Sequence, residues 1–251
     1  MECVVPIGLY DPTIELFQPI ATGVFVSTIG LVCTARHAFV FEPQFLESMS
    51  HLSEVSYPAI YQYFSDHTFS IRPITALHPH PKHDLAIAVC EPLRHLATDA
   101  PFENMMQACT DEIFSIGTNV HQYSYPEPIL FERDATLQVL MIPQCTQGTI
   151  IDWLPNGMGR LFPSPVYVIE GHIGAGSSGG PVMDQTGRVI AISSRGCEAE
   201  NYYYAIPVSG IADIKLGSVL LSSPPQVRGP TVREMVARGF MSFVRRIEEP
   251  G

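Results

Sequence analysis

The sequence contains no uninterrupted run of about 18 apolar residues, the length that a helix needs to cross a bilayer. Its first residues, MECVVPIGLYDP, also lack the basic start, the apolar middle and the small-residue cleavage site of a secretory signal. Hydrophobic residues make up 46% of the chain and charged residues only 16%, a balance that excludes a disordered protein. We therefore expect a soluble protein that works in the cytoplasm without a membrane partner.

Metal-binding patterns are scarce as well. The six cysteines form no CxxC pair, and without an export signal we expect them to stay free thiols. They are Cys3, Cys33, Cys90, Cys109, Cys145 and Cys197. His78, His80 and His83, in HPHPKHD, have a spacing that could bind a metal, but a proline-stiffened loop is the simpler interpretation. We expect no metal site.

Basic residues are few. The chain has 14 Lys and Arg against 25 Asp and Glu, which gives a formal net charge of -11. A nucleic-acid binder needs basic patches that contact phosphates, so we expect no nucleic-acid partner. The charge is uneven, because residues 217–251 hold five of the basic residues and three of the acidic ones. This C-terminal segment is therefore electrostatically distinct from the rest.

Short β-type runs separated by turn residues dominate the chain and predict an all-β fold. A first series lies at 20–35, 58–64, 67–77 and 84–89. A second series lies at 112–118, 135–142, 146–154, 165–171, 188–194 and 202–208. Two antiparallel β lobes fit this division, joined by the β-poor stretch 91–111. We predict an N-terminal lobe with its crossing segment over 1–111 and a C-terminal lobe over 112–216.

The remaining segment, 217–251, is predicted to contain a hinge at 222–230 and an amphipathic helix at 231–247. Apolar residues recur there at helical spacing, and Thr231 with Glu234 makes a T-x-x-E capping box. We expect the apolar side of this helix to pack on its own domain; the alternative is docking on a regulatory partner or a neighbouring subunit. A weaker helix is predicted at 45–55.

The string GAGSSGGPVMD, residues 174–184, places a serine among four glycines. An acyl-transfer nucleophile needs main-chain N–H groups turned toward a developing oxyanion, and glycine permits the dihedral angles that this requires. Ser178 is the candidate nucleophile, and the N–H groups of Gly176 and Ser178 are the candidate oxyanion donors. The alternative is an ordinary glycine-rich turn.

A serine hydroxyl is a poor nucleophile near neutral pH, so this hypothesis requires a histidine base and a group that orients it. His37 follows a β-type run in VCTARHAFV, and Asp84 opens an apolar strand in KHDLAIAV. Each residue alone is better explained as a structural or turn residue. The conjunction of the three residues is what favours catalysis.

The motifs TARHAF, HDLAIAV and GSSGGPV resemble the three active-site motifs of trypsin-like serine proteases, in the order His, Asp, Ser. The likeness spans roughly residues 18–212 and is strongest to bacterial protease domains of the high-temperature-requirement type. It implies two six-stranded β-barrels with the active site between them, and a peptide-bond hydrolase that needs no cofactor. It also implies that Ser194 hydrogen-bonds the aspartate, and that the substrates are proteins or peptides.

The sequence departs from the digestive members of that family. Ser177 stands where they carry the aspartate that pairs with a newly cut amino terminus, so no activating cut is expected. His172 occupies the position at the base of the substrate pocket, with Arg195 and Tyr204 as further pocket candidates. An acidic or polar residue before the scissile bond is one prediction; if His172 points elsewhere, a small apolar residue is preferred instead.

The leading interpretation is an intracellular serine endopeptidase that is regulated. Its main rival is an inactive protease fold that binds or recruits proteins, because a fold can outlast its chemistry. An α/β-hydrolase esterase is excluded, because that fold requires a strand, turn and helix around the nucleophile and the order Ser, Asp, His.

Overall fold

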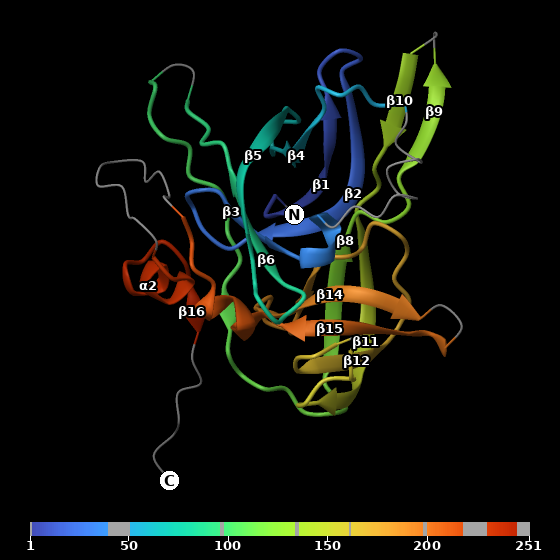
Figure 1. Cartoon of the computed structure of the whole chain (residues 1–251), viewed down its shortest axis with the longest axis vertical. Coiled ribbons are helices and arrows are strands. Elements are labelled where there is room, and N and C mark those ends of the chain that lie inside the picture. The colour runs from blue at the N-terminus through green and yellow to red at the C-terminus, as the bar shows by residue number, and fades with distance from the viewer. Residues whose placement is uncertain are drawn as a thin grey trace.

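Two closed barrels of antiparallel strands, one above the other in Figure 1, dominate this computed structural model. The structure describes residues 2–39, 51–95, 98–133, 136–160, 162–197, 200–217 and 230–244. Each barrel has six strands, the second closing through an additional pairing between β13 and β14. The predicted double-barrel fold is therefore confirmed.

The first barrel runs in the order β1, β2, β3, β6, β5, β4. Its strands are β1 (Val4–Asp11), β2 (Leu16–Phe25), β3 (Leu31–Thr34), β4 (Tyr57–Tyr63), β5 (Phe69–Pro79) and β6 (Ala86–Cys90). Side chains such as Val24, Leu31 and Ile87 are fully buried in its interior. The apolar runs of the sequence therefore form strands because closure of the barrel removes them from water.

One charged side chain is enclosed with them. Arg72 on β5 is 1% exposed, and its guanidinium donates to Oε1 of Gln62 at 2.6 Å, to Oδ1 of Asn104 at 2.6 Å and to the carbonyl oxygen of Glu91 at 2.7 and 3.0 Å. Buried charges are tolerated where hydrogen bonds replace the lost water. Arg72 thus ties two strands of the barrel to the crossing segment.

The second barrel contains β8 (Asn119–Ser124), β11 (Gln144–Leu154), β12 (Val166–Glu170), β13 (Pro181–Met183), β14 (Val189–Cys197) and β15 (Tyr202–Pro207). The short strands β7 (Cys109–Thr110) and β16 (Phe243–Val244) extend its sheet beside β14. The 3₁₀ helix η3 (Val208–Asp213) follows β15. Ile150, Ile169 and Ile190 lie in the interior of this barrel.

One predicted strand is wrong, and another forms outside the barrels. Residues 112–118 form no strand, because the chain turns at Gly117, whose φ is +90°, and the first strand of this barrel is β8 instead. The run 135–142 contains β10 (Thr136–Leu140), but this strand pairs only with β9 (Ile129–Arg133) in a separate hairpin that projects from the barrels (Figure 1).

The C-terminal helix is much shorter than predicted. Helix α2 spans Val232–Ala237, and its predicted capping box between Thr231 and Glu234 is confirmed. Gly239 then adopts a φ of +80°, and the N–H of Phe240 donates to the carbonyl oxygen of Met235. A left-handed residue just after a helix ends it, so the apolar residues beyond turn back and form β16.

The apolar side of α2 is covered by the chain itself. Val232 and Met235 are fully buried, and Met241 pairs with Ser27 of the first barrel in an isolated bridge. The segment therefore packs on its own domain, as predicted. Apart from Pro230, the hinge at 222–230 lies outside the described residues, as do residues 45–50 of the weaker helix; residues 51–55 form turns.

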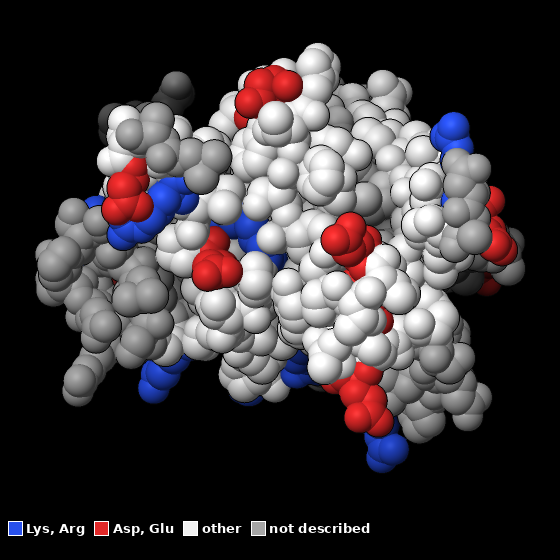
Figure 2. All heavy atoms as spheres, turned by 90° about the horizontal axis from the view of Figure 1, so that it is seen from above, with Lys and Arg blue, Asp and Glu red and all other residues white. Residues whose placement is uncertain are grey.

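Charge is spread over the surface. On the described part of the face in Figure 2, acidic and basic side chains stand in small separate groups within a largely uncharged surface. The net charge of -11 is therefore not gathered into one strong field on this face. Within the residues described, no helix is both long and apolar enough to cross a membrane.

Candidate active site

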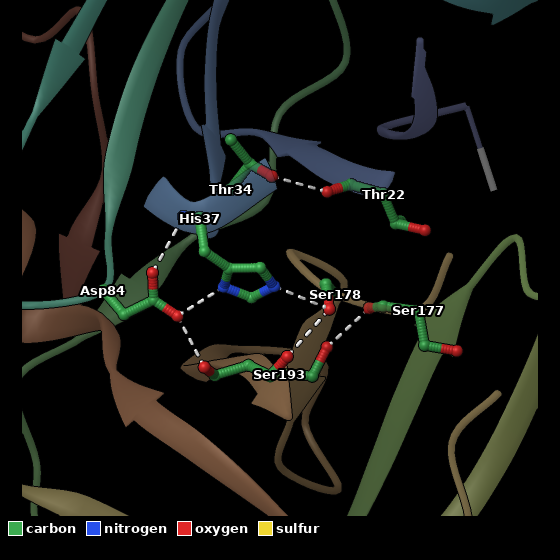
Figure 3. Close-up of polar contacts among 8 residues, drawn as sticks. Thr22, Thr34, His37, Asp84, Ser177, Ser178 and Ser193 are labelled. Atoms are coloured by element: carbon green, nitrogen blue, oxygen red, sulfur yellow. Dashed lines mark hydrogen bonds and ion pairs between the residues drawn. The ribbon is translucent and has the colours of Figure 1, made fainter. Parts of the chain in front are cut away.

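His37 lies in the short 3₁₀ helix η1 (Arg36–Phe39), directly after β3. Its main-chain N–H donates to Oδ1 of Asp84 at 2.9 Å, while Nδ1 of its ring faces Oδ2 of the same carboxylate at 2.7 Å (Figure 3). The two contacts fix both the backbone and the ring. The carboxylate therefore selects the tautomer with the proton on Nδ1 and leaves Nε2 facing the cleft.

Asp84 lies in the loop before β6 and is held by two residues. Oδ2 also accepts a hydrogen bond from Oγ of Ser194 at 2.5 Å. Burial alone would raise the pKa of Asp84, but the hydrogen bonds and charge of His37 together with the Ser194 hydroxyl outweigh burial and lower this pKa to about 2. Asp84 is thus an ionised carboxylate at any physiological pH.

Ser178 comes from the second barrel, at the turn before β13. Its Oγ lies 3.0 Å from Nε2 of His37 and 2.7 Å from the carbonyl oxygen of Ser194. The structure therefore brings Ser178, His37 and Asp84 into one hydrogen-bonded row, although 141 positions separate the serine from the histidine and 47 separate the histidine from the aspartate. Neutral Nε2 can accept the hydroxyl proton at this distance.

The turn before Ser178 requires glycine at position 176 and sets the direction of the Gly176 N–H group. Gly176 has a φ of +90°, and a methyl group at this position would lie 2.8 Å from the carbonyl oxygen of Tyr125, so only glycine fits. The carbonyl oxygen of Ala175 accepts the N–H of Glu127 at 2.6 Å. In a trans peptide the N–H points opposite to the carbonyl, so the Gly176 N–H points away from Glu127. In the described part of the chain, neither Gly176 nor Ser178 donates its amide to a protein acceptor.

Two of the three pocket candidates are neighbours, because Arg195 on β14 pairs with Tyr204 on β15. His172 is exposed and lines a polar cavity of about 380 Å³ together with Gln144 and Glu127. Tyr204 packs against Phe162 at 4.8 Å between ring centres, and Arg195 is exposed on β14. The cavity that His172 lines is also lined by Gly174 and Ser177 of the nucleophile turn, and the assignment of His172 to the substrate pocket stays a prediction.

The residue after His172, Ile173, was not predicted as a pocket residue. Ile173 is 7% exposed and points into the second barrel among its core side chains. A methyl group placed on Gly196 would lie 3.2 Å from Cγ1 of Ile173 and 3.3 Å from its carbonyl oxygen. The segment before the nucleophile and β14 are therefore close together, with Ile173 between them. An apolar residue inside a glycine-rich turn was the available signal.

Two of the three histidines of HPHPKHD bind main-chain amides through their ring nitrogens. Nδ1 of His80 accepts the N–H groups of Lys82 and His83, and Nε2 of His78 accepts the N–H of Gly217. Among the residues described, no group of three or more His, Cys, Asp or Glu side chains is placed to hold a metal ion.

A model of the family described as "Trypsin-like peptidase domain" matches residues 21–192. The chain belongs to the trypsin-like peptidase family. This membership confirms the resemblance seen in the sequence and implies protein or peptide substrates. No curated protein sequence gives a significant match to the chain.

Three solved structures share the fold at low identity. The active form of the Rv3671c protease from M. tuberculosis is 17% identical with a TM-score of 0.55, over 84% of this chain and 78% of that one. The MamO protease domain from Magnetospirillum magneticum is 16% identical with a TM-score of 0.57, over 83% and 93%. Deg5 is 18% identical with a TM-score of 0.53, over 83% and 84%.

Proposed function

We propose that this trypsin-like protein is a serine endopeptidase in which Ser178 is the nucleophile, His37 the general base and Asp84 the residue that orients and stabilises the histidine. The observation that carries the proposal is the hydrogen-bonded row from Asp84 through His37 to Ser178, with distances of 2.7 and 3.0 Å. A serine becomes a nucleophile when such a base takes its proton.

The reaction proceeds through an acyl-enzyme. Nε2 of His37 takes the proton of Ser178 as Oγ attacks the substrate carbonyl carbon, and Asp84 stabilises the imidazolium that forms. The N–H groups of Gly176 and Ser178 bind the oxyanion. His37 then gives its proton to the leaving amine, and a water attacks the ester by the reverse sequence of proton transfers. The chemistry requires no cofactor.

We propose a small apolar side chain before the scissile bond. Ile173 occupies space between the turn and β14, and its contact with Gly196 leaves little room for a long side chain. No charged side chain takes part in this contact, so an arginine or lysine entering it would lose its hydration without gaining a partner. His172 is exposed to solvent, so water screens any contact that it makes with an entering acidic side chain.

The proposal includes an intracellular place of action under the control of a partner. The described cysteines Cys3, Cys33, Cys90, Cys109 and Cys145 are all free, which fits a reducing compartment. The hairpin of β9 and β10 exposes Ile129 and Phe131, at 52% and 40%. It begins two residues after Glu127, whose N–H binds the turn at Ala175. A partner that binds this hairpin would shift Glu127, and with it the turn that carries the Gly176 and Ser178 amides.

Labelling with a fluorophosphonate tests the proposed function. Wild type should be labelled, and S178A and H37A should not, whereas S115A, which removes an exposed serine remote from the row, should be labelled like wild type. Hydrolysis of a casein substrate should follow the same order. If S178A were labelled as fast as wild type, Ser178 would not be the nucleophile; if wild type remained unlabelled, the inactive binding fold would be the better description.

A further inference from the structure

The carbonyl groups of the oxyanion turn are held from behind by two buried hydroxyls. Ser193 is fully buried on β14, and its Oγ donates to the carbonyl oxygen of Ser177 at 2.7 Å (Figure 3). The N–H of Gly180 reaches the same oxygen at 3.0 Å. Because a carbonyl and the N–H of its peptide unit point in opposite directions, these bonds set the direction of the Ser178 N–H.

Thr22 holds the adjoining peptide unit from the other barrel. It is fully buried on β2, and its Oγ1 donates to the carbonyl oxygen of Gly176 at 2.9 Å while accepting the N–H of Tyr125 at 3.0 Å. Its main-chain N–H donates to the carbonyl oxygen of Ser178 at 2.8 Å. Thr22 of the first barrel therefore hydrogen-bonds to the turn on both sides of the nucleophile.

Thr22 can bind the turn because it lies beyond the end of the pairing between β2 and β3. The pairing of β2 with β3 stops at Val24 and Cys33, so the main-chain groups of Thr22 are left for other partners. The carbonyl oxygen of Thr22 accepts a hydrogen bond from the hydroxyl of Thr34 at 2.7 Å. Gly179 fits against both threonines only because it has no side chain: a methyl group there would clash with the Thr22 carbonyl oxygen and with Oγ1 of Thr34.

We propose that Thr22 and Ser193 are positioning residues of the oxyanion hole, whose hydroxyls orient the turn that presents the Gly176 and Ser178 amides. The proposal rests on the proposed function, because it assigns those amides to the oxyanion. Preorganised donors stabilise a transition state only while their directions are fixed. The simpler alternative is that each hydroxyl satisfies a buried carbonyl and contributes to stability alone.

The two interpretations differ in what a lost hydroxyl changes. T22V keeps the shape and the main-chain N–H of Thr22 but removes Oγ1, and T22S restores it. S27A is the matched control, because the fully buried Ser27 hydroxyl accepts the N–H of Leu31 at 2.9 Å in the first barrel and does not contact the turn. All variants are made in the full chain, and S193A tests the second hydroxyl separately.

The measurements are kcat and KM on one peptide substrate, together with the melting temperature. Removal of a whole oxyanion donor costs about 10²–10³ in kcat, so misorientation should cost roughly 10- to 100-fold. We expect that loss of kcat in T22V and S193A with KM changed less than about threefold, recovery in T22S, and wild-type kcat in S27A despite a similar fall in melting temperature.

Amide resonances separate this proposal from the proposed function. In nitrogen-15 spectra the Gly176 and Ser178 amides should shift in T22V and S193A but not in T22S or S27A, whether or not the wild type cleaves peptides. Unchanged resonances in T22V and S193A would overturn the positioning role, and so would an unchanged kcat in an active protein. Shifted resonances in a protein that is never labelled would support the positioning role and reject the protease.

Discussion

The hydroxyl of Ser178 lies nearer to the carbonyl oxygen of Ser194, at 2.7 Å, than to Nε2 of His37, at 3.0 Å. A hydroxyl has one proton, so these two acceptors compete for it. Ser194 also binds Asp84 through its own hydroxyl. Ser194 thereby contacts both Ser178 and Asp84, the two ends of the row whose middle is His37. A change at Asp84 should therefore affect the whole row.

We expect D84N to lower kcat/KM by roughly 10⁴-fold, the scale of that change in trypsin-like enzymes. An asparagine can place its NH₂ group toward Nδ1, which favours the wrong tautomer and leaves no charge to stabilise the imidazolium. Peptide hydrolysis measures the loss. The companion S194A, which keeps the carboxylate, should lose far less, roughly tenfold. A D84N enzyme within tenfold of wild type would contradict the assigned role.

Acid should weaken the protein through the same carboxylate. The pKa of Asp84 is lowered from its ordinary value of 3.8 to about 2 in the folded state. A lowered carboxyl pKa contributes stability above the unfolded pKa, and this contribution is lost as pH falls through the folded pKa. For this side chain, 16% exposed, it amounts to about 2 kcal/mol.

The measurement for this acid effect is urea unfolding of wild type and D84N at intervals from pH 5 to pH 2. The difference in free energy of unfolding between them should shrink over the range from about pH 4 to pH 2. A difference that stayed constant over that range would show that Asp84 is not stabilised as an anion.

Shortening Ile173 should change substrate choice. I173A opens the space beside Gly196, so leucine or phenylalanine before the scissile bond should gain roughly 10- to 100-fold in kcat/KM relative to alanine. A peptide series that varies only this residue measures the change. I151A removes an isoleucine that is 41% exposed, and it should keep the wild-type order. Equal profiles for I173A and wild type would place the substrate pocket elsewhere.

Loss of the buried guanidinium should destabilise the first barrel. R72M removes the donor that Gln62, Asn104 and Glu91 share and leaves the buried oxygens of Gln62 and Asn104 without it, so we expect a loss of about 2–5 kcal/mol in the free energy of unfolding. Arg94, whose side chain is 58% exposed in a pair with Asp99, is the comparison; R94M should cost less than about 1 kcal/mol. Equal losses in urea unfolding would show that burial of Arg72 is unimportant.

The sequence predicted the parts of this molecule that depend on local signals. The motifs around His37, Asp84 and Ser178 are short strings, and the capping box of Thr231 lies within four residues. The length of the last helix was wrong because its apolar spacing continued past Gly239, whose left-handed conformation ends the helix. The hairpin of β9 and β10 was missed because an alternating run does not say which strand it pairs with.

Contacts between distant parts of the chain were out of reach of the sequence. Oγ1 of Thr22 meets the carbonyl oxygen of Gly176 across 154 positions, and threonine in a β-type run is ordinary. The direction of the Ile173 side chain depends equally on where β14 passes. Such relationships are fixed by how two barrels meet, and a single sequence does not show this.

The grip of Thr22 on the nucleophile turn has a consequence for engineering and for recombination between relatives. The first barrel supplies one of the two hydroxyls that hold the nucleophile turn of the second, so the barrels are not interchangeable modules. A chimera that joined this second barrel to a foreign first barrel could fold and could still align histidine with serine. Without a hydroxyl at the position of Thr22, the chimera would have the nucleophile, but the turn that carries its oxyanion donors would not be held in place.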